Sequence, residues 1–306
     1  MMEEAHILVH KKNCGFLENI LKNNSLGHAY LFIGPKGVGK RTVALWFAKK
    51  ILREENIEKS QNFCQILDEK SIKIEEVRKL RHSLSLKNPF GRRRVIVIDD
   101  AASLTPEAQN AFLKIFEEPA KDVTYILLTN NVSRVLPTVL SRAQRVRFTQ
   151  GDRKQIFNNL IEKGLEREDA MQIALFSRGC LREAERLSEN LGEFVDRKNF
   201  LREVLSIFKK EYFLRFNFIK KILDQERNIP DFLTDFDGLI KDILSLKLGR
   251  EDDVANRFLM DEMKSFGHSF SKEKLVEFLK FSGELRSLLL KNVNSKLALE
   301  KLMLMV

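Results

Sequence analysis

The sequence predicts an α/β domain built on a parallel sheet, followed by an all-α second half. Short apolar runs alternate with helical patterns up to Phe148, which is typical of βαβ units around a parallel sheet. Beyond Phe148 the strand patterns end, and helical periodicity continues to the C-terminus. With 306 residues, the chain has room for about two domains, or three if one is small. Hydrophobic residues make up 43% and charged residues 31%, which excludes disorder, and no apolar run is long enough to span a membrane.

Four apolar runs in the first half predict strands. They cover residues 29–33, 95–98, 124–128 and, more weakly, 146–148. The first three are apolar nearly throughout and do not alternate, which predicts strands that helices cover on both faces. Apolar residues at helical spacing predict helices over 44–51, 77–84 and 108–115. Thr105 and Pro106 are suited to start the last of these helices, and Pro119 is suited to end it.

The second half divides into two helical regions. The helices expected over 152–164, 168–177 and 181–189 are short and predict a small bundle over 149–190. From 191 to 306 the amphipathic helices are longer, and the last covers about 296–304. The sequence therefore predicts three domains, with limits at 1–148, 149–190 and 191–306.

The basic excess is concentrated in the first of these domains. Of the net charge of +10, residues 1–148 carry +9 and the remaining residues carry +1. A polyanionic partner, either a nucleotide or a nucleic acid, is the simplest reason for this asymmetry. The acidic start at residues 1–4 leads into no apolar segment, so we expect no secretory signal and a cytoplasmic protein without a membrane partner.

A glycine-rich segment after the first predicted strand is a candidate phosphate-binding loop. It consists of Gly34, Pro35, Lys36, Gly37, Val38, Gly39 and Lys40, and it opens a predicted helix, as a P-loop requires. Backbone N–H groups of such a loop surround a phosphate, and the lysine reaches the terminal phosphates. The next position, which normally offers a Ser or Thr hydroxyl to magnesium, is Arg41. Thr42 lies about 100° further around the helix and cannot replace that hydroxyl, so a glycine-rich turn that has lost its nucleotide is the alternative.

Two carboxylates end the second of the long predicted strands. Asp99 stands where P-loop enzymes place the aspartate associated with magnesium. Asp100 follows it and is one methylene shorter than the glutamate that many such ATPases use to orient the attacking water. Two acids that end a strand and face the basic run at 92–94 are the alternative interpretation. Arg41 and Asp100 are departures that affect hydrolysis more than binding.

Three motifs and several flanking segments are specific enough to indicate a family. They are DDAASLT at 99–105, AQNAFLKIFEEP at 108–119 and LPTVLSR at 136–142, with HAYLF at 28–32, NVN at 292–294 and LALE at 297–300. Together they strongly resemble the bacterial clamp-loader subunits of the AAA+ class, and the resemblance covers essentially the whole chain. It implies an AAA+ P-loop NTPase-like domain, a three-helix lid and a helical collar that joins a five-subunit ring.

The resemblance also implies roles for single residues. Arg142, in the Ser-Arg pair at 141–142, matches the arginine finger that reaches the ATP site of a neighbouring motor subunit. Thr129 and Asn130, at the end of a predicted strand, match the polar sensor region. Arg182, in the segment GCLR at 179–182, matches the second sensor, which reports bound phosphate from the lid. For Arg142 and Arg182 a surface ion pair is the alternative.

Two departures from the family pattern concern metal and cysteine. The family usually has Cys after the Ser-Arg pair and a four-cysteine zinc module after the P-loop helix, whereas this chain has Ala143 and, in the module's region, only Cys64. Cys14 and Cys180 lie far from Cys64, so neither a disulfide framework nor zinc is expected. The candidate cofactor is ATP or ADP with magnesium.

These observations favour a non-motor or weakly nucleotide-binding subunit of the sliding-clamp loader, whose own ATPase activity is weak or absent. The implied partners are other clamp-loader subunits, of the gamma/tau and delta types, in a hetero-pentameric ring, together with the sliding clamp and primed DNA. The collar at 191–306 is expected to carry oligomerisation, and the basic domain to hold the DNA backbone, with Arg92, Arg93 and Arg94 as one candidate cluster. The alternatives are an ATP-hydrolysing motor subunit of the gamma/tau type, an independent DNA-remodelling ATPase and a nucleotide kinase.

Overall fold

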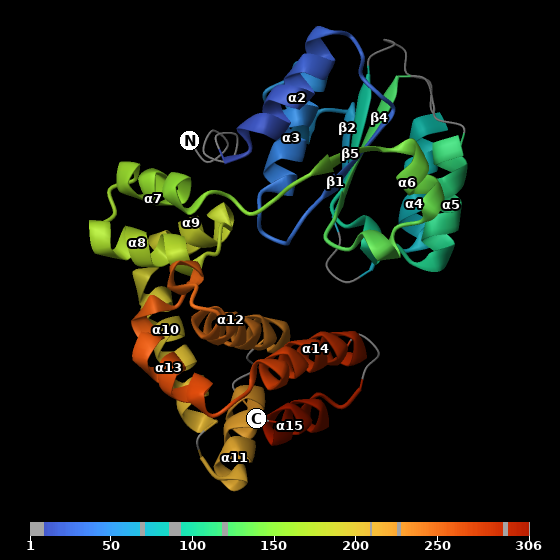
Figure 1. Ribbon diagram of the computed structural model, residues 1–306. Helices are drawn as coiled ribbons and strands as arrows, with labels where there is room; N and C mark the ends of the chain where they lie inside the picture. Colours follow the sequence, from blue (N-terminus) through green and yellow to red (C-terminus); the bar gives the residue numbers. More distant parts are fainter. Residues whose placement is uncertain are drawn as a thin grey trace. The chain divides into compact units, whose positions relative to one another are not determined.

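The computed structural model describes residues 9–67, 71–85, 93–117, 122–208, 210–224, 228–289 and 293–305 (Figure 1). The chain forms two compact units, of which the first runs up to Asn159 and includes 179–183, and the second comprises 160–178 and the residues from Ala184 onward. Parts of several predictions lie outside the described residues: residues 1–4, Arg92, Glu118, Pro119 and Asn292.

The first unit is built on a five-stranded parallel sheet. Its strands are β1 (Ala29–Ile33), β2 (Phe63–Ile66), β3 (Arg94–Ile98), β4 (Val123–Thr129) and β5 (Gln144–Arg147). Their order is β2-β3-β4-β1-β5, and every neighbouring pair is parallel. The parallel sheet and the four predicted strands are confirmed, with β5 beginning two residues earlier than its apolar run.

Helices cover both faces of this sheet, as the continuous apolar strands predict (Figure 1). One face packs against α2 (Lys11–Lys22) and α3 (Lys40–Leu52), and the other against α4 (Ile74–Ser85), α5 (Pro106–Glu117) and α6 (Pro137–Arg142). Alternate residues of one strand enter the two cores, because side chains of a strand point to opposite faces in turn. In β1, Leu31 packs in the core between the sheet and α5, whereas Phe32 packs in the core between the sheet and α3.

The apolar pattern does not predict β2 or α2. The strand is only four residues long, lies at the edge of the sheet and buries only Ile66 fully. Its register comes from pairing with β3, where Ile66 lies opposite Ile98. Helix α2 carries a narrow apolar stripe of Cys14, Leu17 and Ile20. Short 3-10 helices complete the unit: η1 (Ile57–Lys59), η2 (Ala101–Ser103) and η3 (Val132–Arg134).

The helices predicted beyond Phe148 are present. They are α7 (Arg153–Glu162), α8 (Arg167–Phe176), α9 (Leu181–Glu189), α10 (Leu191–Ile207), α11 (Tyr212–Asp224), α12 (Ile229–Lys247), α13 (Met260–His268), α14 (Lys272–Leu289) and α15 (Ser295–Met305), with the 3-10 helices η4 (Glu251–Asp253) and η5 (Arg257–Leu259). In the second unit, α12 contacts α10, α13 and α14. Phenylalanine rings fill the space between them, with Phe236 5.6 Å from Phe208 and 6.5 Å from Phe278 between ring centroids.

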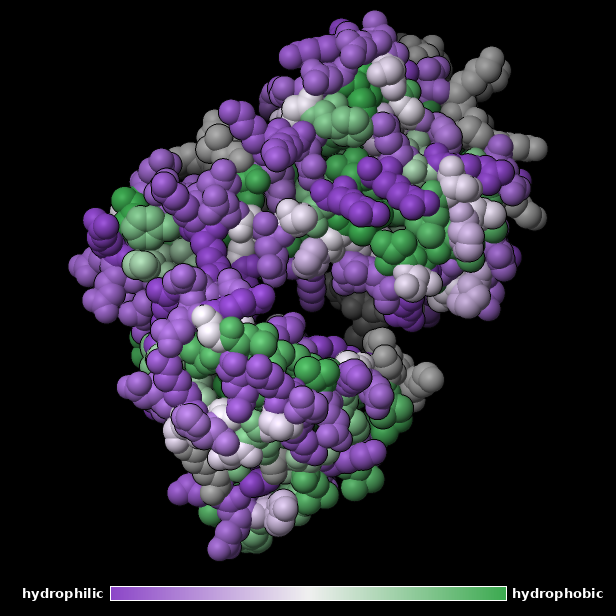
Figure 2. Space-filling view, in the orientation of Figure 1, coloured by the Kyte–Doolittle hydropathy of each residue, from purple (hydrophilic) through white to green (hydrophobic). Residues whose placement is uncertain are grey.

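One face of the molecule is seen in the space-filling view (Figure 2). Figure 2 shows that hydrophilic residues cover most of the visible face, with hydrophobic residues gathered in smaller patches. Among the described residues, no helix is both long and apolar enough to cross a membrane.

Candidate functional site

The candidate site lies where the strands of the first unit's sheet end. Gly34 directly follows β1, Asp99 directly follows β3, and Thr129 is the last residue of β4. Since neighbouring strands are parallel, their carboxyl ends lie side by side at one end of the sheet, which is where open α/β sheets bind their ligands. The N–H of Gly34 donates to the carbonyl of Thr129 at 3.1 Å, so the glycine-rich loop and the end of β4 are joined directly.

The loop after β1 keeps the backbone shape of a phosphate cradle. Gly37 and Gly39 have φ values of +81° and +102°, a region that residues with side chains rarely adopt. Gly34 is needed for a different reason, because a Cβ there would lie 2.4 Å from the carbonyl oxygen of Phe148. Helix α3 begins at Lys40, immediately after the loop, so its first N–H groups face the cradle.

Lys40 places its ammonium group inside this loop. Its residue is 9% exposed, and Nζ donates to the carbonyl of Gly34 at 2.6 Å and to that of Pro35 at 2.7 Å. Burial lowers the pKa of Lys40, and the carboxylates of Asp100 and Asp99 act in the opposite direction. The loop therefore contains the lysine that a P-loop uses for phosphate, and its carbonyls hold that lysine in place.

The magnesium position of this site does not fit a magnesium ion. Magnesium requires octahedral coordination by oxygen atoms, with waters and carboxylates as the usual ligands. Here Arg41 replaces the hydroxyl residue, and its guanidinium Nη1 lies 3.5 Å from Oδ2 of Asp99. A cation of the chain itself thus lies beside the carboxylate that would face the metal. Thr42, the neighbouring hydroxyl residue, is half-buried one position further along α3.

The remaining polar residues at this edge take part in local turns. Oδ1 of Asp100 accepts a hydrogen bond from the N–H of Ala102 at 3.0 Å and so caps η2. The hydroxyl of Thr129, which is 1% exposed, donates to the carbonyl of Asn131 at 3.2 Å and accepts from its N–H at 3.1 Å. Asn130 is exposed between them. Asp100, Thr129 and Asn130 thus all follow or end strands at the carboxyl end of the sheet. The side chains of Asp100 and Thr129 are hydrogen-bonded to nearby backbone groups.

The start of α9 contacts the glycine-rich loop within the first unit. The thiol of Cys180 lies 3.6 Å from the carbonyl of Lys36 and donates to it. Burial raises the pKa of Cys180, the carboxylate of Glu183 raises it further, and Lys40 acts in the opposite direction. Arg182 follows two residues later and is exposed. Arg182 thus lies two residues from a loop contact, and none of the described contacts joins its own side chain to the loop.

Arg142 lies just before β5, at the amino ends of the strands and not at the carboxyl ends where the loop lies. It is the last residue of α6 and stands two residues before Gln144, which begins β5. Gln144 lies opposite Tyr30, whereas the glycine-rich loop starts four residues later at Gly34. With about 3.3 Å per residue, Gln144, which begins the strand after Arg142, lies roughly 13 Å along the strands from the start of the loop. Arg142 is exposed, and no hydrogen bond or ion pair joins its side chain to any other described residue.

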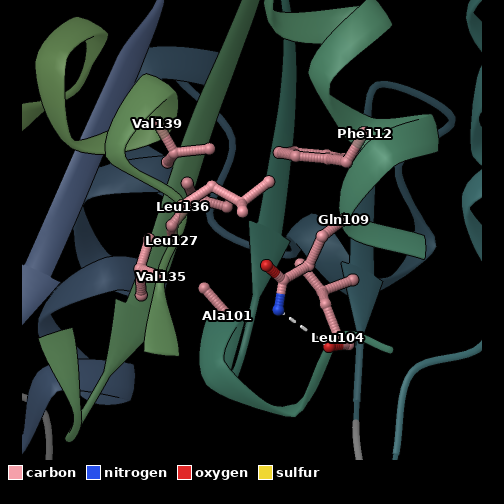
Figure 3. A pocket seen from close by; sticks show the side chains of 8 residues that line it. All are labelled: Ala101, Leu104, Gln109, Phe112, Leu127, Val135, Leu136 and Val139. Carbon is pink, nitrogen blue, oxygen red and sulfur yellow. Dashed lines mark hydrogen bonds between the residues drawn. The ribbon is translucent and has the colours of Figure 1, made fainter. Parts of the chain in front are cut away.

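A small apolar cavity lies beneath the segment that carries Arg142 (Figure 3). It is lined by Ala101, Leu104, Gln109, Phe112, Leu127, Val135, Leu136 and Val139. Its volume of about 10 Å³ is room for at most one water molecule, so it holds no ligand site. Nε2 of Gln109 donates to the carbonyl of Leu104 at 2.9 Å and to that of Arg134 at 3.4 Å. These bonds fix the connection from β4 to α6 against α5.

Two residues that were not predicted for this site also contact the loop. Nε2–H of His10 donates to the carbonyl of Val38, and the His10 ring packs edge-on against Phe148 with 4.9 Å between centroids. Cys180 is the second. The contact of His10 spans 28 residues of sequence, and no local pattern indicates it. Cys180 lies within the segment GCLR at 179–182, which the family resemblance associates with bound phosphate, although its contact spans 144 residues. Among the described residues, no group of three or more His, Cys, Asp or Glu side chains could hold a metal ion.

Two family matches cover most of the chain. Residues 9–152 match the family described as DNA polymerase III, delta subunit. Residues 193–306 match the family described as DNA polymerase III, delta subunit, C terminal.

Individual relatives point in the same direction. The delta-prime subunit of DNA polymerase III from Bacillus subtilis is 29% identical over 314 residues, covering 95% of this chain and 94% of the relative. The delta-prime subunit of Pseudomonas aeruginosa is 32% identical over 38% of this chain and 41% of its own length. A solved gamma subunit-related protein of Thermotoga maritima is 20% identical, with a TM-score of 0.51 over 94% of this chain and 97% of that one, and it shows the same fold.

Proposed function

The chain belongs to the DNA polymerase III delta-subunit family as a delta-prime-like clamp-loader subunit, and we propose that it assists a neighbour's ATP hydrolysis without hydrolysing ATP itself. The observation that carries this proposal is the position of Arg142. It is exposed near the amino ends of the strands, whereas the glycine-rich loop of the same chain lies at their carboxyl ends. We therefore assign this guanidinium to the nucleotide of a neighbouring subunit. An arginine finger supplied in trans stabilises the charge that develops on the transferred phosphoryl group.

The chain's own loop supports the second half of the proposal. Hydrolysis needs a metal ion that bridges the phosphates and a group that orients the attacking water. Arg41 stands in the place of the hydroxyl that would hold magnesium, and the carboxylate of Asp100 caps η2. The loop can therefore hold phosphate through Lys40 and the N–H groups of α3, but it lacks the parts for cleavage. ATP or ADP is thus a ligand of this site and not its substrate.

The proposed partners follow from this role. They are motor subunits of the gamma/tau type, a delta-type subunit, the sliding clamp and primed DNA, which meet in the cytosol. The basic excess of residues 1–148 supports a contribution to holding the DNA backbone without reading its sequence. Within the predicted basic cluster, Nη1 of Arg94 already donates to the carbonyl of Ser83 at 2.9 Å. Binding of DNA by the assembled loader should therefore weaken with salt and change little with sequence.

The test is the ATPase rate of the assembled loader carrying Arg142→Ala. A missing arginine finger costs about 10³ to 10⁵ in rate at the site that it serves. Only one of several sites loses its finger, so the overall loss is smaller and appears in the rate stimulated by clamp and primed DNA. Assembly and this subunit's own nucleotide affinity should be unchanged, since Arg142 is exposed and remote from the loop.

Two matched variants complete this test. Arg134→Ala removes another exposed arginine of the same connection and should leave the rate unchanged. Lys40→Ala alters only the chain's own loop and should have little effect on loader turnover. If Lys40→Ala abolished the loader's ATPase activity while Arg142→Ala left it intact, the chain would be a motor subunit, and the proposal would be wrong.

A further inference from the structure

The glycine-rich loop keeps its anion cradle although its metal position has changed. Gly37 and Gly39 retain the positive φ values that aim backbone N–H groups at a phosphate, and α3 starts at the loop. Lys40 as a residue is 9% exposed, and its ammonium group donates to the carbonyls of Gly34 and Pro35 inside the loop. A phosphate that enters the cradle would meet a cation that is already desolvated. The binding half of a P-loop is thus intact.

The chain supplies its own positive charge where the metal would stand. The guanidinium of Arg41 lies 3.5 Å from the carboxylate of Asp99, and the two side chains are 38% and 29% exposed. Arg41 is the residue after Lys40, so both cations project from the first turn of α3. A guanidinium stays protonated at all physiological pH values and binds phosphate oxygens through two parallel N–H bonds. It can therefore neutralise Asp99 and contact a bound phosphate, which are the two electrostatic tasks of magnesium.

We propose that this loop binds a diphosphate group, such as that of ADP, without a divalent cation, because Arg41 occupies the electrostatic place of magnesium. The inference rests on the glycine-rich loop as a phosphate site and not on the role of Arg142. A free diphosphate and a nucleoside diphosphate share the recognised chemistry. A divalent cation would have to displace the guanidinium from Asp99 and would find no hydroxyl ligand at position 41.

The test is calorimetric titration of the full chain with ADP, once with EDTA and once with Mg²⁺. The dissociation constant should agree between the two buffers within about threefold. Arg41→Thr restores the hydroxyl of ordinary P-loops and removes the guanidinium. With EDTA it should bind ADP about 10- to 100-fold more weakly than the unaltered chain, the loss expected for a hydrogen bond to a charged group. Mg²⁺ should restore its binding, and this rescue should disappear in the double variant Arg41→Thr, Asp99→Asn.

Further arms identify the ligand and the site. Lys40→Ala should lose ADP binding in both buffers. Pyrophosphate should bind with EDTA as well, and if only ADP binds, the nucleoside contributes to a site that is still independent of metal. Thermal unfolding followed by circular dichroism checks that each variant is folded.

Three results would overturn the inference. They are no ADP binding by the unaltered chain in either buffer, binding at least about tenfold tighter with Mg²⁺ than with EDTA, and no effect of Arg41→Thr with EDTA. The first two need no variant at all, so they stand even if Arg41→Thr does not fold. None of these results bears on Arg142, whose test uses the assembled loader.

Discussion

The guanidinium of Arg178 lies 2.9 Å from the carboxylate of Asp242, whose side chain is 1% exposed. The same carboxylate accepts hydrogen bonds from the backbone N–H groups of Ala255 and Asn256 and from the side-chain amide of Asn256. Arg178 also donates to the carbonyl of Gly238 at 2.8 Å. All of these residues belong to the second unit. A buried charge without partners is costly, so this cluster stabilises the unit because four donors converge on the carboxylate of Asp242.

Replacing Arg178 by Ala should lower the free energy of unfolding by about 1.5 to 3 kcal/mol, the range for a hydrogen bond to a charged group. The loss stays below that of a fully buried pair because the Arg178 side chain is 29% exposed and Asp242 keeps three other donors. Urea unfolding measures the change. The control is Arg250→Ala, whose ion pair with Asp253 joins side chains that are 63% and 52% exposed and should contribute under about 1 kcal/mol. Equal losses in the two variants would contradict the assigned role.

The close approach of Gly34 to Phe148 makes Gly34→Ala a destabilising change. The added Cβ would lie 2.4 Å from a carbonyl oxygen and 2.9 Å from the Cβ of Phe148, and backbone atoms cannot move aside cheaply. The expected cost is about 1 to 3 kcal/mol, as for other overpacked sites, and thermal unfolding should show it. Gly15→Ala is the matched control, because nothing lies within 4 Å of a Cβ built there in α2. That variant should gain about 0.5 to 1 kcal/mol from helix propensity, and a loss there would refute the argument from space.

Cys14 should make the stability of the first unit depend on alkaline pH. Burial raises the pKa of its thiol from an ordinary value of 9.0 to about 11, and the carboxylate of Glu18 adds to this increase. The protonated thiol is therefore favoured in the folded state. Its contribution to stability is fully present below pH 9 and is lost as the pH rises through 11. A shift of about two pKa units corresponds to roughly 2 to 3 kcal/mol.

The measurement for Cys14 is the difference in unfolding free energy between the unaltered chain and Cys14→Ala, followed by urea titration from pH 8 to pH 11. Other groups titrate in both proteins and cancel in the difference. The advantage of the unaltered chain should shrink across this range. A difference that stays constant with pH would show that the thiol ionises as easily in the folded chain as in the unfolded one.

Exposed apolar residues on α11 and α15 allow a test of the proposed collar. Tyr212 and Phe213 on α11 are 55% and 70% exposed, and Leu297 and Leu304 on α15 are 62% and 53% exposed. Phe213→Asp should weaken co-purification with loader partners by roughly 5- to 30-fold, as expected when an aromatic anchor is lost, without unfolding the chain. Leu248→Asp, at a residue 49% exposed beyond the end of α12, is the control and should retain the partners. Retention of all partners by Phe213→Asp would place the assembly surface elsewhere.

Contiguous patterns of the sequence determined the α/β first half, the helical second half and the composition of the candidate site. Runs of four or five mostly apolar residues and helical periodicity are local properties, so β1, β3 and β4 could be predicted from their own residues. The glycine-rich loop and Asp99 could also be predicted to lie together, because the carboxyl ends of parallel strands lie at the same end of the sheet. The edge strand β2 escaped prediction since pairing with β3, and not its own pattern, makes it a strand.

Only the tertiary structure decided how the site's charges are paired. Arg41 and Asp99 are 58 positions apart in the sequence. Their ion pair exists because both follow parallel strands, β1 and β3, whose carboxyl ends lie at the same end of the sheet. His10 likewise reaches the loop carbonyl of Val38 across 28 residues, whereas the cap that Asp100 gives η2 is a local contact with Ala102. The register of β5 against β1 likewise places Arg142 near the amino ends of the strands, whereas Gly34 lies at their carboxyl ends. Residue types and spacing state which chemistry is available, but the distances between charges, which decide what that chemistry does, arise only when the strands pair.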